Sequence, residues 1–292
     1  MSRYLFTYFK GEEDDGEQIY FAASRDGLFW EDLNDGKPVL VSDVGTKGIR
    51  DPFPVYDPQT EKYYIIATDL RAASGQGWQE AKRFGSRDLL VWESRDLIKW
   101  SEVRQCTVGI PKSGCVWAPE AIYDKEKEQF FVFFASWIGD RQSGNGKQKI
   151  YACYTRDFKE FTDSFLYIER EDDVIDTTII EADDAYFRIS KNETSKRLIL
   201  ERGESLTGEF HEIQSELLER LCGIEGPQCY QLSDGRWCLI ADYYSKGTGY
   251  FPMVSEDLNS GKFTLLKNTE YHMGDVKKRH GGVLKILNAA DE

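Results

Sequence analysis

Three acidic residues stand where short apolar segments begin, and they are the residues best placed to do chemistry. They are Asp51 within residues 48–52, Asp176 within residues 174–180, and Glu225 within residues 223–227. Each segment is typical of the start of a buried strand, where an ionised side chain is costly unless it is paired or has a catalytic task. Three such carboxylates, far apart in sequence, predict a shared acidic pocket. Paired carboxylates are the groups that cleave glycosidic bonds.

Composition limits the classes of partner. The chain has 292 residues, of which 40% are hydrophobic, and its formal net charge is −14. We expect neither nucleic acid nor an anionic membrane surface as a partner, because both require basic patches. No apolar stretch is long enough for a transmembrane helix, and the first ten residues lack the apolar run and cleavage site of a signal peptide. A cytoplasmic location is therefore expected.

The cysteines predict free thiols. There are six, at Cys106, Cys115, Cys153, Cys222, Cys229 and Cys238, and none of them forms a C-x-x-C pair. Only three histidines are present, and none has the spacing of a zinc site. Thiols within apolar strand patterns, such as Cys153 and Cys238, are typical of buried residues in a reducing compartment.

Two short patterns recur along the chain. The first, a Ser or Thr followed two residues later by Asp and then by an aromatic, occurs at residues 24–30, 94–100 and 155–161 and more loosely at 255–258. The Asp is expected to accept hydrogen bonds from backbone N–H groups in a tight turn, and the aromatic to fill the gap between sheets. The second, a β-branched and aromatic run after a polar turn, occurs at residues 61–66, 128–134 and 235–240 and predicts strands.

This spacing predicts an all-β fold, a five-bladed β-propeller with four-stranded blades in a single domain over residues 1–292. Four blades are expected within the chain, at about residues 50–105, 116–163, 174–215 and 224–267. Residues 4–41 would supply most of a fifth blade, and residues 280–286 its missing strand. Pairing of the N- and C-terminal segments would close the ring and remove an open sheet edge. One short helix is expected within residues 215–221.

In a propeller the innermost strands line a central channel, so the three blade-opening acids should converge at one mouth of it. At these positions the chain resembles glycoside hydrolase family 43. The tripeptides Arg50-Asp51-Pro52, Ile175-Asp176-Thr177 and Glu225-Gly226-Pro227 match the signature acids of the family, and residues 116–120 and 279–281 match two further landmarks. The resemblance covers nearly the whole chain in the right order. It implies a five-bladed propeller that hydrolyses arabinofuranosides or xylosides with inversion.

The resemblance also implies roles for the three acids. Asp51 would be the general base that activates a water, and Glu225 the general acid that protonates the leaving oxygen. Asp176 would orient Glu225 and raise its pKa, because a neighbouring carboxylate disfavours ionisation. Inversion requires the base and the acid on opposite faces of the sugar, roughly 6.5–9.5 Å apart.

Substrate contacts are implied at four further residues. Trp117 would be a sugar-stacking platform, with a core aromatic as the alternative. Glu120 would bond substrate hydroxyls, although the family often has Asp there. Arg279 belongs to a family landmark and is expected to bind substrate. Arg50 would bind substrate or pair with an acid, and strand alternation favours pairing outside the channel.

No cofactor is expected to be required, but the resemblance allows a structural calcium ion in the central channel. His280 matches a family histidine that faces the channel near such an ion. One imidazole is a poor calcium ligand, so waters would have to complete the shell. A hydrogen-bonded structural role for His280 is the alternative.

The expected function is that of an inverting, exo-acting glycoside hydrolase that releases terminal α-L-arabinofuranosyl residues from oligo- or polysaccharides. The loops at residues 71–85, which hold Trp78 and Phe84, and at residues 137–147 are expected to shape a closed pocket. No segment within the 292 residues is identified as the β-sandwich that many xylan-active members use, which favours arabinofuranosides over xylosides.

Alternatives remain on the same scaffold. β-Xylosidase or β-galactofuranosidase activity would need only a different sugar pocket. A phosphorylase-like enzyme acting on mannosides would use one acid and a basic phosphate pocket, and the presence of both Glu225 and Asp176 argues against it. A non-catalytic carbohydrate-binding propeller would usually lack one of the three acids.

Overall fold

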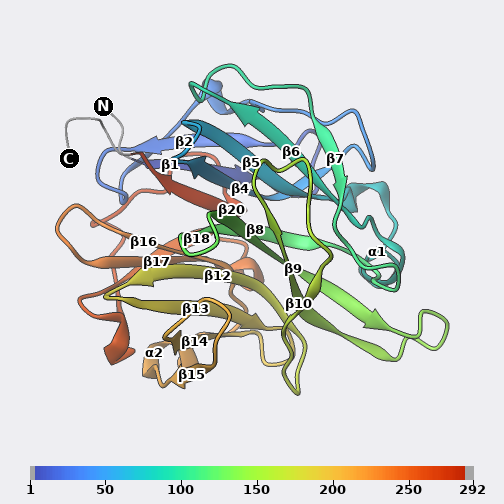
Figure 1. Ribbon diagram of the computed structural model, residues 1–292. Coiled ribbons are helices and arrows are strands. Elements are labelled where there is room, and N and C mark those ends of the chain that lie inside the picture. Colours follow the sequence, from blue (N-terminus) through green and yellow to red (C-terminus); the bar gives the residue numbers. More distant parts are fainter. Residues whose placement is uncertain (1–3, 287–292) are drawn as a thin grey trace.

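Five four-stranded antiparallel sheets are arranged in a ring (Figure 1). This computed structural model describes residues 4–286. The all-β, five-bladed propeller with four-stranded blades is therefore confirmed. The single domain expected over residues 1–292 extends beyond this range, because residues 1–3 and 287–292 lie outside the described part of the chain.

The first blade joins the two ends of the described chain, as expected. Its strands, from the channel outward, are β20 (Arg279–Lys285), β1 (Tyr4–Phe9), β2 (Tyr20–Ser24) and β3 (Trp30–Asp32). Six Cα pairs link β1 to β20, from Tyr4 with Lys285 to Phe9 with Arg279. The ring is thus closed by backbone hydrogen bonds between segments about 275 residues apart, and β1 has a paired strand on each side.

The other four blades follow in sequence, each beginning with its innermost strand. Their strands are β4 (Ile49–Asp57), β5 (Lys62–Asp69), β6 (Asp88–Ser94) and β7 (Arg104–Thr107); β8 (Trp117–Asp124), β9 (Gln129–Gly139), β10 (Gly146–Thr155) and β11 (Phe165–Ile168); β12 (Val174–Ala182), β13 (Ala185–Asn192), β14 (Arg197–Gly203) and β15 (Phe210–Ile213); and β16 (Glu225–Gln231), β17 (Trp237–Asp242), β18 (Tyr250–Ser255) and β19 (Thr264–Leu265). The third blade runs past the expected boundary at residue 163, because β11 begins at Phe165.

In the described part of the chain, two α-helices lie outside the blades. The helix α1 (Trp78–Phe84) interrupts the connection between β5 and β6, and α2 (Glu216–Arg220) precedes β16 within the expected helical segment. No helix of the described residues is both long and apolar enough to cross a membrane.

The recurring Ser/Thr-x-Asp pattern forms the turns that were expected. In the third blade, Asp157 Oδ1 accepts hydrogen bonds from the backbone N–H groups of Lys159 and Glu160. The next residue, Phe158, is fully buried, and its ring lies 4.6 Å from Tyr64 and 4.9 Å from Phe130. Because Tyr64 belongs to the second blade, Phe158 is a wedge between neighbouring sheets. Burial of such a side chain contributes about 1.5–3 kcal/mol.

Each innermost strand carries a β-bulge near its N-terminal end. The register shifts between Arg50 and Phe53 in β4, Trp117 and Glu120 in β8, Ile175 and Thr178 in β12, and Glu225 and Gln228 in β16, and His280 is the extra residue in β20. Positive φ angles mark the extra residues Asp51 (51°), Ala118 (46°), Asp176 (49°) and Gly226 (57°). A bulge turns a side chain away from strict alternation, and these five bulges border one cavity.

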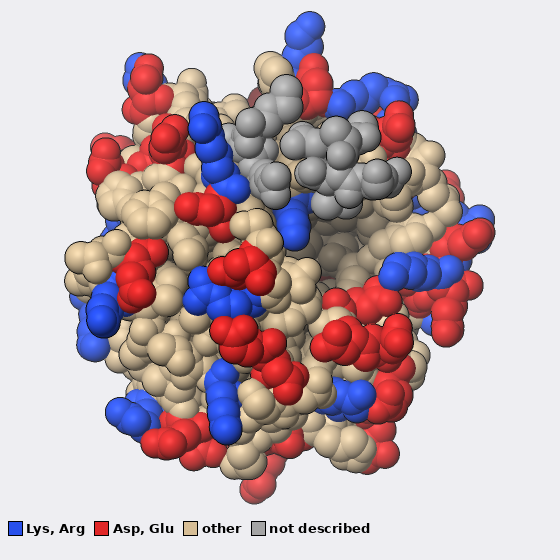
Figure 2. Space-filling model, turned by 90° about the vertical axis from the view of Figure 1, so that its left-hand side faces the viewer, with Lys and Arg blue, Asp and Glu red and all other residues tan. Residues whose placement is uncertain are grey.

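Charged side chains of both signs lie among uncharged residues on the surface. On the face in Figure 2, Lys and Arg are scattered among Asp and Glu, which form the larger groups. All six cysteines are free, and Cys115, Cys153, Cys229 and Cys238 are buried. Cys222 is exposed, and it differs in this respect from the buried thiols expected from the strand patterns.

Candidate active site

A cavity of about 300 Å³ opens at one end of the channel, and every blade contributes to it. We call the residues just before the five bulges the mouth ring: Arg50, Trp117, Ile175, Glu225 and Arg279. All five line the cavity. Of the bulge residues, Asp51, Asp176 and His280 line it as well. The prediction that the three acids converge at one channel mouth is therefore confirmed.

A second set of residues stands behind the mouth ring. We call the residues that pair with the mouth ring across the sheet the support ring: Thr68, Ala135, Lys191, Asp242 and Phe9. All of them except Ala135 contact a residue of the mouth ring or of the bulges. The sheet register itself thus places a second layer of side chains against the cavity.

Asp51 is held by Thr68. The Thr68 hydroxyl donates to Asp51 Oδ2 at 2.8 Å, and its oxygen accepts from the backbone N–H of Ala118 at 2.8 Å. Because Ala118 belongs to the third blade and Asp51 to the second, this hydroxyl links two bulges. The Asp51 side chain is 13% exposed, so one face of the carboxylate remains open to the cavity.

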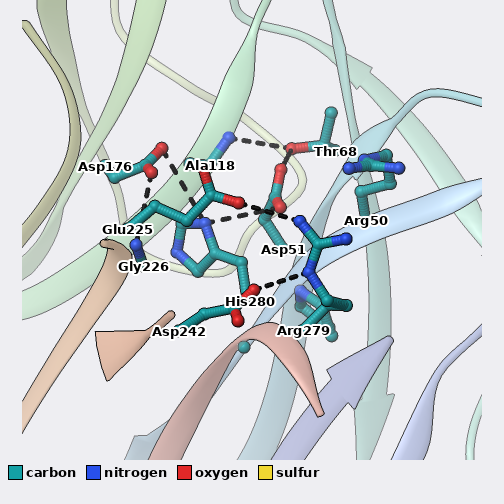
Figure 3. A network of polar contacts seen from close by, with 12 residues as sticks. Arg50, Asp51, Thr68, Ala118, Asp176, Glu225, Gly226, Asp242, Arg279 and His280 are labelled. Carbon is teal, nitrogen blue, oxygen red and sulfur yellow. Dashed lines mark hydrogen bonds and ion pairs between the residues drawn. The ribbon is translucent and has the colours of Figure 1, made fainter. Parts of the chain in front are cut away.

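Glu225 is held between two cations. Lys191 Nζ lies 2.8 Å from Oε2, and Arg279 Nη2 lies 2.9 Å from Oε1 (Figure 3). Burial raises the pKa of Glu225, but Lys191 and Arg279 outweigh it and lower the pKa to about 2. The raised pKa expected for this residue is therefore wrong for the unliganded protein. The reason is that the positions of Lys191 and Arg279 beside Glu225 could not be predicted from sequence.

Asp176 contacts the neighbouring blade and not the Glu225 carboxylate. Its Oδ2 accepts from the backbone N–H of Gly226 at 3.3 Å, and its Oδ1 lies 3.8 Å from Nδ1 of His280. Burial raises the pKa of Asp176 to about 6, against the opposing effects of His280 and Lys191. At Gly226 a Cβ would meet the His280 ring at 2.7 Å, so glycine is required for this close approach.

His280 stands between the two aspartates. Its Nδ1 lies 3.4 Å from Asp51 Oδ1 and 3.8 Å from Asp176 Oδ1, and Figure 3 shows the ring between them. Among residues 4–286, no group of three or more His, Cys, Asp or Glu side chains is arranged to hold a metal ion. The side chains present thus do not form a calcium site by themselves, and a water-completed site stays a prediction.

Arg50 pairs with two acids and also borders the cavity. Its Nη1 lies 2.7 Å from Glu12 Oε1 and 2.9 Å from Glu17 Oε1, which confirms the alternative of acid pairing. The expected position outside the channel is wrong, because the bulge breaks strand alternation and leaves both Arg50 and Asp51 at the cavity. Its guanidinium also lies 5.0 Å from the ring of Trp78.

Glu120 does not reach the pocket. It is 3% exposed, accepts a hydrogen bond from Gln228 Nε2, and is absent from the cavity lining. Burial raises its pKa well above the ordinary value. Contact with substrate hydroxyls is therefore contradicted. The residue lies beyond the bulge of β8, so it points into the channel below the cavity rather than into its mouth.

Aromatic residues form one wall of the cavity. Trp117 lines it and meets Trp78 edge to face, with ring centroids 6.3 Å apart. Trp78 is 53% exposed and begins α1, so the loop at residues 71–85 shapes the entrance as expected. The second loop does not, because Trp137 is buried and Arg141 packs on Phe84, outside the cavity.

Several cavity residues were not foreseen from sequence. They are Lys191, Glu193, Lys196, Tyr244 and Leu70 on the wall, with Thr68 and Asp242 behind it. Lys191 shares its strand with another cation, Arg188, and so did not stand out in the sequence. Its partner Glu225 lies in the next blade, which only the closed ring reveals.

Three carboxylates meet at the channel mouth of a five-bladed propeller, and two cations, Lys191 and Arg279, pair with one of them. This is the arrangement expected of a glycoside hydrolase domain. The chain belongs to glycoside hydrolase family 43, since residues 1–292 match the related family model described as a probable glycosyl hydrolase domain. It is 30% identical over 267 residues to an α-L-arabinofuranosidase of Bifidobacterium longum subsp. longum. That alignment covers 79% of this chain and 25% of the relative, so the chain spans about a quarter of the length of this curated relative.

Solved structures share the fold at low identity. An exo-β-1,3-galactanase from Clostridium thermocellum superposes with a TM-score of 0.63 and 12% identity, over 90% of this chain and 59% of that one. An endo-1,4-β-xylanase from Bacteroides thetaiotaomicron gives a TM-score of 0.59 and 14% identity, over 98% and 94% of the two chains. Likeness at this level supports the propeller architecture alone.

Proposed function

We propose that this chain is an inverting exo-glycosidase that releases terminal α-L-arabinofuranosyl residues. The observation that carries the proposal is the single cavity lined by Asp51, Asp176 and Glu225. The similarity to the arabinofuranosidase of Bifidobacterium supports the choice of sugar. The cavity volume of about 300 Å³ suits one sugar ring rather than a through-running polymer.

In the proposed mechanism Asp51 acts as the general base. A water between Asp51 and the sugar attacks the anomeric carbon and gives its proton to the carboxylate. The bond from that carbon to the leaving oxygen breaks, and Glu225 transfers a proton to this oxygen. Thr68 donates to Asp51 Oδ2 and His280 Nδ1 lies 3.4 Å from Oδ1, so both oxygens are held in place, while the exposed part of the carboxylate can accept the proton of the water.

Glu225 must gain a proton before it acts, because Lys191 and Arg279 favour its ionised form in the unliganded protein. Substrate hydroxyls that bind Lys191 and Arg279 would weaken the interaction of these cations with Glu225, and this change raises the pKa of Glu225. Asp176, whose pKa burial raises to about 6, is a nearby group that can hold a proton near neutral pH.

A neighbouring pocket suits the leaving group. It is also about 300 Å³ in volume and shares Trp78, Tyr244 and Arg279 with the first cavity. Glu12 lines it too, 3.9 Å from Nη1 of Arg279. A sugar bound there would place its linking oxygen on the side of Arg279 and Glu225.

The test is hydrolysis of a panel of 4-nitrophenyl glycosides, the α-L-arabinofuranoside, β-D-xyloside, β-D-galactofuranoside and β-D-galactoside. Wild type is compared with Asp51→Asn, and Asp57→Asn at the opposite end of β4 is the matched control. We expect arabinofuranoside cleavage that falls by about 10²- to 10⁴-fold in Asp51→Asn and persists in the control. Cleavage of another sugar alone, or no cleavage by folded protein, would refute the proposed substrate.

A further inference from the structure

Asp242 is a buried carboxylate that reaches Glu225 only through another residue. It ends β17, where it pairs directly with Glu225 in the sheet register, and none of its surface is exposed. Its Oδ2 lies 2.5 Å from Nε of Arg279, and Nη2 of the same guanidinium lies 2.9 Å from Oε1 of Glu225. Figure 3 shows the three side chains in this order.

The carboxylate is poorly supported as a purely structural group. Within residues 4–286 its Oδ1 has no hydrogen-bond partner, although the atom is buried. A buried carboxylate with one oxygen unpaired is costly to the fold, since desolvation is offset by only one ion pair. The position is therefore better explained by what Asp242 does to Arg279 than by what it adds to stability.

Arg279 has competing partners that would draw it away from Glu225. Its Nη1 lies 3.9 Å from Glu12 Oε2, on the wall of the neighbouring pocket, and its guanidinium lies 5.7 Å from the ring of Phe9. The guanidinium is planar, so fixing Nε fixes the direction of both Nη groups. Asp242 holds Nε and thereby directs Nη2 to Glu225.

We propose that Asp242 is a positioning residue for the general acid, acting on Glu225 through Arg279. The inference rests on the proposed function, because it takes Glu225 as the proton donor. Lys191 contacts the other oxygen of Glu225 directly and does not depend on Asp242. Loss of Asp242 should therefore leave Glu225 in the cavity but loosen one of its two anchors.

The kinetic test compares two leaving groups. Asp242→Asn keeps the shape of the side chain and removes its charge, and Asp242→Ser is the second variant should the first fail to fold. On a methyl or disaccharide glycoside, which needs acid assistance, we expect kcat to fall by about 10- to 100-fold with KM changed by less than about threefold. On a 2,4-dinitrophenyl glycoside, which needs none, kcat should fall by less than about threefold.

Matched controls separate positioning from a structural role. Asp124 is also a buried aspartate, but it caps the β8–β9 turn at the other end of its blade, where Oδ1 accepts from the N–H groups of Glu126 and Lys127. Asp124→Asn should lower both kcat values alike or leave both unchanged. In a Glu225→Gln background, Asp242→Asn should cause no further loss, because residues acting as a unit are not additive. Equal loss on both leaving groups, or an additive loss in this cycle, would overturn the proposal.

A second readout requires no substrate. The Nε–H signal of Arg279 in ¹⁵N NMR, identified by its loss in Arg279→Lys, should show slow exchange in wild type and fast exchange in Asp242→Asn. If wild type cleaves no glycoside, the proposed function fails, whereas this signal still decides whether Asp242 positions Arg279. An unchanged Nε–H signal in Asp242→Asn would contradict that positioning.

Discussion

Lys191 on β13 places its Nζ 2.8 Å from Oε2 of Glu225 on β16, so a salt bridge between neighbouring blades holds the expected acid of the site. Only 3% of the Lys191 side chain is exposed, and it also lies 2.7 Å from Glu193 Oε2. Little solvent screens such a pair, so it acts strongly on the protonation of Glu225. Glu225 is therefore ionised at neutral pH in this arrangement.

Replacement of Lys191 by Met should raise the pKa of Glu225 above its value of about 2, because the effect of burial is then opposed by Arg279 and His280 but no longer by Lys191. Titration of the Glu225 side-chain carbonyl by ¹³C NMR, assigned with Glu225→Gln, measures this shift. Lys125→Met is the control, since it removes the same charge from an exposed pair with Glu181. The same titration midpoint in wild type and Lys191→Met would contradict the role given to the cation.

Glu225→Gln should lose activity according to the leaving group. A general acid contributes about 10²- to 10⁴-fold, so we expect a loss of that size on alkyl or sugar glycosides. Hydrolysis of a 2,4-dinitrophenyl glycoside should be nearly retained, because this leaving group departs without protonation. Comparison of kcat for the two substrates is the measurement, and an equal loss on both would remove Glu225 from the role of proton donor.

Asp176 should make stability fall as pH rises. Burial raises its pKa from 3.8 to about 6 in the folded protein, so between about pH 4 and 6 the unfolded chain releases a proton that the folded chain keeps. In wild type this group lowers the free energy of unfolding as pH rises through that window, by on the order of 3 kcal/mol. Asp176→Asn lacks the effect, and Asn tolerates the positive φ of 49° at this bulge.

Urea unfolding of wild type and Asp176→Asn at pH 4, 5, 6 and 7 checks this prediction. The stability difference between Asn variant and wild type should grow in favour of the variant across the window and then level off. Parallel curves for the two proteins would show that Asp176 titrates in the folded state as it does in the unfolded chain.

Trp78→Ala should weaken substrate binding more than turnover. Trp78 borders both pockets, is 53% exposed and contacts Trp117 and Arg50. Loss of an aromatic platform should raise KM by about 3- to 10-fold, with kcat changed less. Phe84→Ala at the other end of α1 is the matched control, since that ring is 46% exposed but lines neither pocket. A similar KM for both variants would count against the platform.

Sequence predicted the ring of blades because four of the five blades repeat a turn whose chemistry is local. Asp26 and Asp157 accept from backbone N–H groups only two and three residues away, so the pattern is visible in a short window. The three acids were found for a similar reason, since each stands at the start of a short segment typical of a buried strand. The closure by residues 280–286 followed from the one strand that the first blade lacked.

Side-chain partners could not be predicted in this way, because they lie across blades. Lys191 and Glu225 are 34 residues apart, and Asp242 and Arg279 are 37 apart. The pKa of Glu225 depends on these partners, so the expected direction of its pKa shift was wrong. Glu120 was misplaced because the bulge at β8 sends the residues that follow it down the channel instead of toward its mouth.

The origin of Arg279 and His280 in β20 has a consequence for synthesis of the protein. Both residues leave the ribosome after all four strands of every other blade, and they reach the cavity only when β20 pairs with β1. A nascent or truncated chain that ends before residue 279 can fold blades but cannot assemble the complete set of cavity residues. Hydrolytic activity, if measured during translation, would therefore report the moment at which the ring closes.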